Sequence, residues 1–277
     1  MLDKYVKKEI RFDEIVDLEE IYDLPTLLCV ELDGTSYEFL LNLKKESNKA
    51  IVFGSGAYDA KIMKPPVFQR HSWAEAFNES TIFYNDPTLY LGELNIGWGY
   101  GTANTHFLKN IAVILEKLFL RKNILHEHVL FYGSSAGGFM SLMLSGMLEG
   151  STALVNNPQV IFTNFYESHV TKLFSLIHPN EEVNFYKEAN KERISVLDFY
   201  KKINRVPKIY YLQNISCLHD IHNQMQPFIM GLSKIASDEN YSEKVELVLY
   251  CDEKKGHNPL DYDETVYYIK KYVGCLG

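Results

Sequence analysis

The chain has 277 residues, and 46% of them are hydrophobic, which is enough to bury the core of one large domain. Its formal net charge of −8 and its pI near 5.6 argue against binding to nucleic acid or to an anionic membrane, because both partners need clustered lysine and arginine. The four cysteines lie far apart and form no C-x-x-C pair, which excludes the usual sequence patterns of zinc knuckles and redox dithiols.

The beginning of the chain is charged and has no apolar run of the kind found in a signal peptide. No later stretch approaches the ~18 uninterrupted apolar residues of a membrane span. We therefore expect a cytoplasmic protein without a membrane span. Residues 1–24 are expected to form an N-terminal extension, with the charged segment 4–20 as a solvated element. No repeat or Gly/Ser-rich linker marks a boundary, so residues 1–277 are interpreted as one domain.

The apolar pattern along the chain predicts an α/β fold. Segments 27–32 and 37–43 flank Asp33-Gly34, a turn pair that favours an antiparallel hairpin. Beyond it, short apolar strands alternate with helical stretches, which indicates a mostly parallel sheet with helices on both faces. The further expected strands are 50–53, 81–84, 129–132, 153–155, 208–212 and 245–250. With the hairpin they make eight, and apolar residues at helical spacing predict a helix over about 104–121.

The segment after strand 129–132 contains the first motif that indicates a catalytic residue. Residues 133–138 have the sequence G-S-S-A-G-G and are followed by a helix-like run. A G-x-S-x-G motif between a strand and a helix is typical of a nucleophile elbow. Gly133 and Gly137 lack the Cβ atoms that would collide in so tight a turn, so Ser135 is the expected nucleophile. The alternatives are Ser134, which stands at the wrong spacing, and a glycine-rich turn that has no chemistry or binds a phosphate. A P-loop would need a lysine after these glycines, and none follows.

A serine nucleophile needs an imidazole base and a carboxylate that orients it. Among the nine histidines only His257 follows the last expected strand, so it is the expected base; a polar surface histidine is the alternative. Asp220 is the only carboxylate in the loop after strand 208–212, which makes it the expected acid unless it caps a helix. Asp252, five residues before His257, is the alternative acid.

An oxyanion needs two backbone donors. The amide of Ala136 is the expected first donor, and Gly56 or Ala57, in the loop after strand 50–53, is the expected second. Tyr58 in the same loop and Trp98 in a glycine-rich loop are the expected substrate-binding residues. For Trp98 the alternative is packing of its loop onto the core.

Metal binding is not expected from the histidine pattern. The H-E-H segment 126–128 and the pair His219 and His222 have spacings that suit a metal, but neither has a third ligand nearby. Unpaired surface histidines explain both, so we expect no metal.

These motifs carry a resemblance to a known family. From about residue 25 to 277 the chain resembles the α/β-hydrolase superfamily, with Ser135, Asp220 and His257 in the family's order. Within it, the chain resembles the bacterial capsular and glycoprotein polysaccharide O-acetyltransferases. The motifs that carry this resemblance are G-S-S-A-G-G at 133–138, N-N-P-Q at 156–159, D-I-H at 220–222 and the G-H pair that ends at His257.

The resemblance implies a function. It implies transfer of acetyl from acetyl-CoA to a sugar hydroxyl through an acetyl-serine, with a glycan or small ester as partner and no tightly bound cofactor. Residues 159–206 are expected to form a cap or substrate wall, but they match no motif. A general carboxylesterase or hydrolase of small esters and a non-catalytic glycan-binding accessory protein of the same fold are the alternatives.

Overall fold

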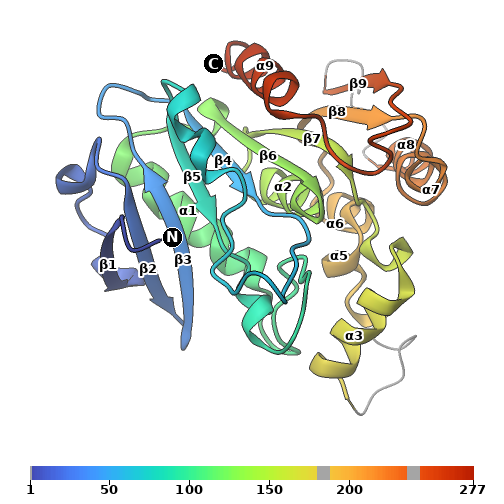
Figure 1. The fold of residues 1–277 in the computed structure, drawn as a ribbon, viewed down its shortest axis with the longest axis horizontal. Helices are drawn as coiled ribbons and strands as arrows, with labels where there is room; N and C mark the ends of the chain where they lie inside the picture. Colours follow the sequence, from blue (N-terminus) through green and yellow to red (C-terminus); the bar gives the residue numbers. More distant parts are fainter. Residues whose placement is uncertain (1, 180–187, 236–243) are drawn as a thin grey trace.

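The computed structural model describes residues 2–179, 188–235 and 244–277. Within these residues nine strands form one sheet in the order β1-β2-β3-β5-β4-β6-β7-β8-β9 (Figure 1). The strands are β1 Val6–Arg11, β2 Thr26–Leu32, β3 Thr35–Asn42, β4 Ala50–Gly54, β5 Ser80–Tyr84, β6 Val129–Ser135, β7 Thr152–Pro158, β8 Lys208–Asn214 and β9 Val245–Tyr250. The sheet is parallel from β5 to β9, and β3 pairs antiparallel with β2 and β5. The mostly parallel sheet predicted from the sequence is confirmed.

The expected number of eight strands was wrong by one. The charged segment 4–20, expected as a solvated element, contains β1, which pairs in parallel with β2 from Val6↔Thr26 to Arg11↔Glu31. The side chains of β1 are exposed or half-buried, so this strand has no apolar pattern that reveals it. Its backbone instead satisfies the hydrogen-bonding groups at the edge of β2.

The turn between β2 and β3 has the expected hairpin geometry. Leu32 pairs with Thr35, so the two residues between them form the loop. Both have positive φ, 51° at Asp33 and 72° at Gly34, as a type I′ turn requires.

Helices cover both faces of the sheet (Figure 1). Along β4, Val52 faces a core that includes α1 and α2, whereas Phe53 faces the core under α9. The helices are α1 Phe107–Lys122, α2 Ala136–Met147, α3 Glu167–Ile177, α5 Lys191–Ile194, α6 Val196–Ile203, α7 Leu218–Asp220, α8 Gln226–Leu232 and α9 Tyr262–Val273. This alternation places the end of β6 between two well-packed layers.

The region 159–206, expected to form a cap or substrate wall, contains α3, α5 and α6. Its helix α6 belongs to the main core, since Val196 and Tyr200 are fully buried there. Helix α3 lies at the lower right of Figure 1, and its Leu173 is fully buried in the same core. Residues 180–187 of this region lie outside the described residues.

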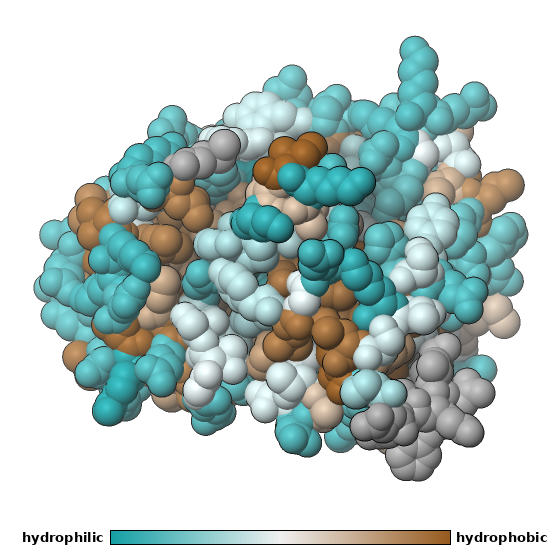
Figure 2. Space-filling view, turned by 60° about the horizontal axis from the view of Figure 1, so that its bottom comes forward, coloured by the Kyte–Doolittle hydropathy of each residue, from teal (hydrophilic) through white to brown (hydrophobic). Residues whose placement is uncertain are grey.

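The surface shows polar and apolar groups side by side. In the view of Figure 2, apolar side chains reach the surface in separate patches bordered by polar ones.

In the described ranges no helix is both long enough and apolar enough to cross a membrane.

Candidate active site

Ser135 lies at a sharp bend between β6 and α2. It is the last residue of β6 and has φ 54° and ψ −123°, a conformation that costs free energy for a residue with a side chain. A Cβ at Gly133 would lie 2.2 Å from the carbonyl carbon of Gly137, and a Cβ at Gly137 would lie 2.3 Å from the carbonyl oxygen of Gly54. The predicted steric reason for glycine at both positions is therefore confirmed.

The bend brings the Ser135 hydroxyl to the side chain of His257. The Oγ atom lies 2.9 Å from His257 Nε2, and His257 Nδ1 lies 2.6 Å from Asp220 Oδ2. Since a carboxylate only accepts, Nδ1 carries the proton that it donates to Asp220, and Nε2 is left to accept from the serine hydroxyl. The structure thus brings together residues far apart in the chain, since His257 lies 122 positions after Ser135 and 37 positions after Asp220.

The three side chains differ in their exposure to solvent. Asp220 is 1% exposed at the end of α7, whereas the His257 side chain keeps 29% of its surface. Phe165 packs beside the imidazole, with ring centroids 5.8 Å apart. The acid is therefore shielded, and the imidazole stays within reach of a ligand.

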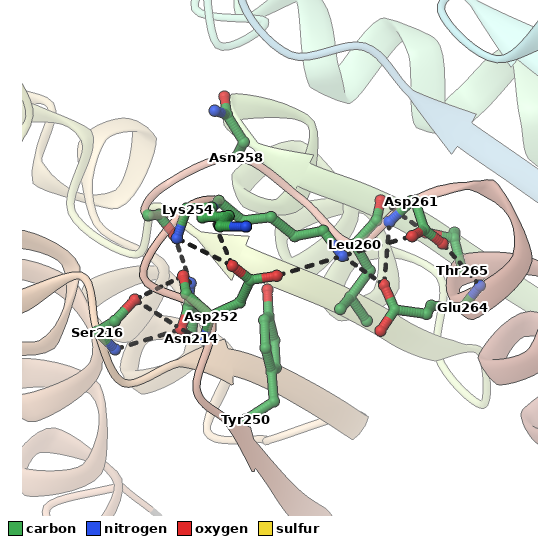
Figure 3. Close-up of polar contacts among 12 residues, drawn as sticks. Asn214, Ser216, Tyr250, Asp252, Lys254, Asn258, Leu260, Asp261, Glu264 and Thr265 are labelled. Carbon is green, nitrogen blue, oxygen red and sulfur yellow. Dashed lines mark hydrogen bonds and ion pairs between the residues drawn. The ribbon is translucent and has the colours of Figure 1, made fainter.

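Ser134 and Asp252, the competing candidates, have other partners. Ser134 is 4% exposed, and its hydroxyl accepts a hydrogen bond of 2.8 Å from the guanidinium of Arg70. The Asp252 carboxylate accepts from the amides of Lys254 and Lys255 at 3.0 and 3.1 Å (Figure 3). The bond from the Lys255 amide lowers the pKa of Asp252 below its ordinary value. Asp252 thus closes the turn that leads to His257.

Buried amide side chains hold the loop that carries His257, and sequence reasoning did not find this role. Asn157 Nδ2 donates to the carbonyls of His257 and Asn258 at 3.2 and 3.1 Å. Asn214 Nδ2 donates to the carbonyls of Asp252 and Gly256 at 2.7 and 2.9 Å (Figure 3). Both asparagines are fully buried in the last residues of strands, and that position is the signal that could have revealed them.

One of the three expected oxyanion donors, the Gly56 amide, is already engaged by another side chain. Ala136 is the first residue of α2, so its amide lies at the positive end of that helix. The Gly56 amide donates to Gln69 Oε1 at 2.9 Å, and Gln69 Nε2 donates to the carbonyl of Ala57 at 2.9 Å. Gln69 thus binds this loop through both ends of its side-chain amide.

The expected sugar-binding role of Trp98 does not fit its position. Trp98 is 1% exposed and its ring stacks on Phe162 with centroids 4.7 Å apart, so the alternative of packing onto the core holds. Its indole N–H donates to Gln159 Oε1. Tyr58 is half-buried, and its amide donates to the carbonyl of Asn95 at 3.0 Å.

Aromatic rings outside the predicted set line the histidine side of the site. Tyr166 is 54% exposed and stacks on His219 with centroids 5.0 Å apart, next to Phe165. These rings lie in the region where the sequence offered no motif. A cavity of only about 10 Å³ is lined in part by Gly56, Trp98 and Ala136.

One group of side chains near the site has the composition of a metal site. Donor atoms of Cys217, Asp220 and His257 lie within 4.8 Å of one another. Both ring nitrogens of His257, however, are hydrogen-bonded, to Asp220 and to Ser135. The hydrogen-bonded chain accounts for the closeness of Asp220 and His257 without a metal.

Comparisons with known proteins bear on the fold. No protein-family model matches this chain, and no curated protein matches it. Among solved structures, the capsule O-acetyltransferase of Neisseria meningitidis serogroup A is similar, with a TM-score of 0.66 and 14% identity over 90% of this chain and 94% of that chain. A histidine-to-alanine mutant of that enzyme in complex with CoA gives a TM-score of 0.65 and 15% identity over 88% and 94%.

A second kind of enzyme is also similar. The acylaminoacyl peptidase of Pyrococcus horikoshii gives a TM-score of 0.57 and 14% identity over 91% of this chain and 41% of that chain. At such identities a likeness shows the fold. Together with the strand order and the bend at Ser135, it establishes that this chain has the α/β-hydrolase fold, as the sequence predicted.

Proposed function

We propose that this chain is a serine-dependent enzyme that acts on acyl esters through an acyl-serine intermediate. The observation that carries the proposal is the hydrogen-bonded series from Ser135 through His257 to Asp220, with distances of 2.9 and 2.6 Å, at a bend where the serine has positive φ. His257 Nε2 takes the hydroxyl proton as Oγ attacks the acyl carbonyl. The imidazolium then returns that proton to the leaving group, while Asp220 stabilises its charge.

The oxyanion formed in this attack is received by backbone amides. Ala136, at the start of α2, supplies one donor, and the loop with Gly56 and Ala57 supplies the other. That loop lies beside the nucleophile, since a Cβ at Gly56 would stand 3.9 Å from Ser135 Cβ. For Gly56 to donate, Gln69 would first have to release its amide, so Ala57 is the preferred second donor.

We assign a carbohydrate acceptor and an acetyl donor as the first candidate. The likeness to a capsule O-acetyltransferase over 90% of this chain supports transfer, and a mutant of that enzyme binds CoA, so acetyl-CoA is the proposed donor. The exposed ring of Tyr166 and the half-buried ring of Tyr58 suit the flat faces of a sugar.

The second candidate is an esterase that hydrolyses small acyl esters. The likeness to a peptidase supports it, because a peptidase passes its acyl group to water. Both candidates use the same nucleophile, base and acid. They differ in whether a sugar hydroxyl or water reaches the acyl-serine.

Labelling with an active-site fluorophosphonate tests the shared machinery. Wild-type protein is expected to be labelled, Ser135→Ala is expected to lose the label, and Ser134→Ala is the matched control that keeps it. Asp220→Asn is expected to slow labelling by roughly 10³-fold or more, because the amide no longer fixes the imidazole. Asp252→Asn is its control. Absence of Ser135-dependent labelling would favour the non-catalytic glycan-binding protein.

Incubation with acetyl-CoA and an oligosaccharide separates the two candidates. Transfer predicts an acetylated sugar detected by mass spectrometry, in an amount that depends on Ser135. Release of free CoA and acetate without acetylated sugar would count against transfer and support the esterase.

A further inference from the structure

Gln159 contacts the nucleophile through both its backbone and its side chain. It follows β7 directly and is fully buried. Its amide N–H donates to the carbonyl of Ser135 at 3.1 Å, and its side-chain Nε2 donates to Ser135 Oγ at 3.2 Å. The Oε1 atom of the same side chain accepts the indole N–H of Trp98. Gln159 therefore connects a buried tryptophan to the reacting oxygen.

Trp98 decides which end of the Gln159 amide faces the serine. The oxygen and nitrogen ends of a carboxamide have nearly the same shape, but an indole N–H can only donate. The oxygen end must therefore turn toward Trp98, which leaves the N–H end turned toward Ser135 Oγ. This orientation follows from hydrogen-bond chemistry.

Trp98 is itself held firmly. Its ring stacks on Phe162 with an interplanar angle of 13°. Asp86, which is buried, accepts from the amide of Gly99 at 2.7 Å and so fixes the turn in which Trp98 has φ 53°. The donor that faces Ser135 is thus fixed before any ligand binds.

We propose that Gln159 is a catalytic residue that stabilises negative charge on Ser135 Oγ, and that Trp98 is the positioning residue that fixes its orientation. The inference rests on the function proposed above. The hydroxyl donates its proton to His257 Nε2, so one lone pair accepts from Gln159 and the other remains for the acyl carbonyl.

The contribution of Gln159 is expected to grow along the reaction. At 3.2 Å the resting bond is long and therefore weak. As the proton passes to His257, charge develops on Oγ and strengthens the bond, so the transition state gains more than the ground state. When the acyl-serine breaks down, the same N–H stabilises Oγ as the leaving group.

Two substitutions separate this role from a structural one. Gln159→Glu keeps the size and the backbone bond, but an ionised carboxylate cannot donate to Oγ. A protonated carboxyl can, because its carbonyl accepts from Trp98 and its O–H donates to Ser135. Trp98→Phe keeps the stacked ring and removes only the N–H that orients Gln159.

The measurement is the second-order rate constant for fluorophosphonate labelling of Ser135 as a function of pH, with Tm as a check on folding. We expect Gln159→Glu to be slower than wild type by on the order of 10²-fold at neutral pH. The wild-type rate constant divided by that of Gln159→Glu is expected to decrease toward one as pH falls and the carboxyl is protonated. Trp98→Phe is expected to be slower by roughly fivefold, the scale of one neutral hydrogen bond.

Gln224→Glu is the matched control. Gln224 is 1% exposed and its Oε1 accepts from the amides of Val160 and Ile161, so this variant introduces the same buried carboxyl without facing Ser135. Its labelling rate is expected to equal that of wild type.

The possible outcomes are distinguishable. If wild-type protein is not labelled at Ser135, the proposed function fails. If it is labelled and Gln159→Glu reacts as fast, or is slowed equally at every pH, the proposed function stands and the role of Gln159 is refuted. If Gln159→Glu does not fold, Trp98→Phe decides, and a wild-type rate in that variant overturns the proposal.

Discussion

Replacing Gly137 with alanine tests whether crowding at the bend shapes the site. Gly137 is the second residue of α2 and has a negative φ, so helix propensity alone predicts that alanine stabilises the protein by about 0.5–1 kcal/mol. The packing predicts the opposite. The new Cβ would lie 2.3 Å from the carbonyl oxygen of Gly54 and 3.1 Å from the carbonyl carbon of Ser55. The two arguments therefore differ in sign.

The size of the effect follows from the displacement that alanine requires. Ordinary contact begins at 3.4 Å, so the backbone of β4 or α2 must move by 3.4 − 2.3, or about 1 Å. Overpacking of this kind costs about 1–3 kcal/mol, which leaves a net loss of up to about 2.5 kcal/mol after the propensity gain. At about 2–4 °C per kcal/mol, Tm should fall by up to roughly 10 °C.

Activity should fall further than stability, because Gly54 leads directly into the loop of Gly56 and Ala57. A displacement of about 1 Å at a reacting centre costs on the order of 10²-fold in rate. Calorimetry gives Tm, and the rate of fluorophosphonate labelling gives the reactivity of Ser135. Gly274→Ala is the control, since Gly274 is exposed and its new Cβ would meet nothing closer than 3.3 Å. An unchanged or higher Tm with full labelling in Gly137→Ala would refute the crowding.

Three further predictions concern the supports of the site. Arg193 is 8% exposed and donates to carbonyls in the loop 100–105, so Arg193→Ala should lower the free energy of unfolding by about 3 kcal/mol, measured in urea; an unchanged midpoint would contradict this. Burial lowers the pKa of His106 well below 6.5, so its contribution to stability is full above pH 6.5 and is lost as pH falls below it; His106→Gln should flatten that loss in urea midpoints taken from pH 7 to 5. Asn214→Ala should loosen the loop of His257 and slow fluorophosphonate labelling roughly tenfold. A wild-type labelling rate in this variant would show that the loop keeps its position without Asn214.

Much of the fold could be predicted because its central strands are buried on both faces. Such strands appear in sequence as short apolar runs, as at 50–53 and 129–132, and these runs form β4 and the first part of β6. Ser135, Asp220 and His257 were predicted from their order relative to those strands, and the structure places their side chains in one hydrogen-bonded series.

The remaining features depend on contacts that no local pattern encodes. Strand β1 forms from charged residues because β2 offers it an edge. Gln159 and Trp98 lie 61 residues apart, and only the folded chain brings them together. From the sequence the Gly56 amide was expected to be available as an oxyanion donor. In the structure it donates to the side chain of Gln69, 13 residues later.

The charged edge strand has a consequence for how the sheet ends. β1 is the outermost strand, and its Lys7 and Glu9 side chains form an ion pair of 2.6 Å along its own length. Another chain that added a strand here would have to strip water from these charges. Although β1 presents a row of backbone groups, its charged side chains therefore disfavour the addition of a further strand at this edge of the sheet.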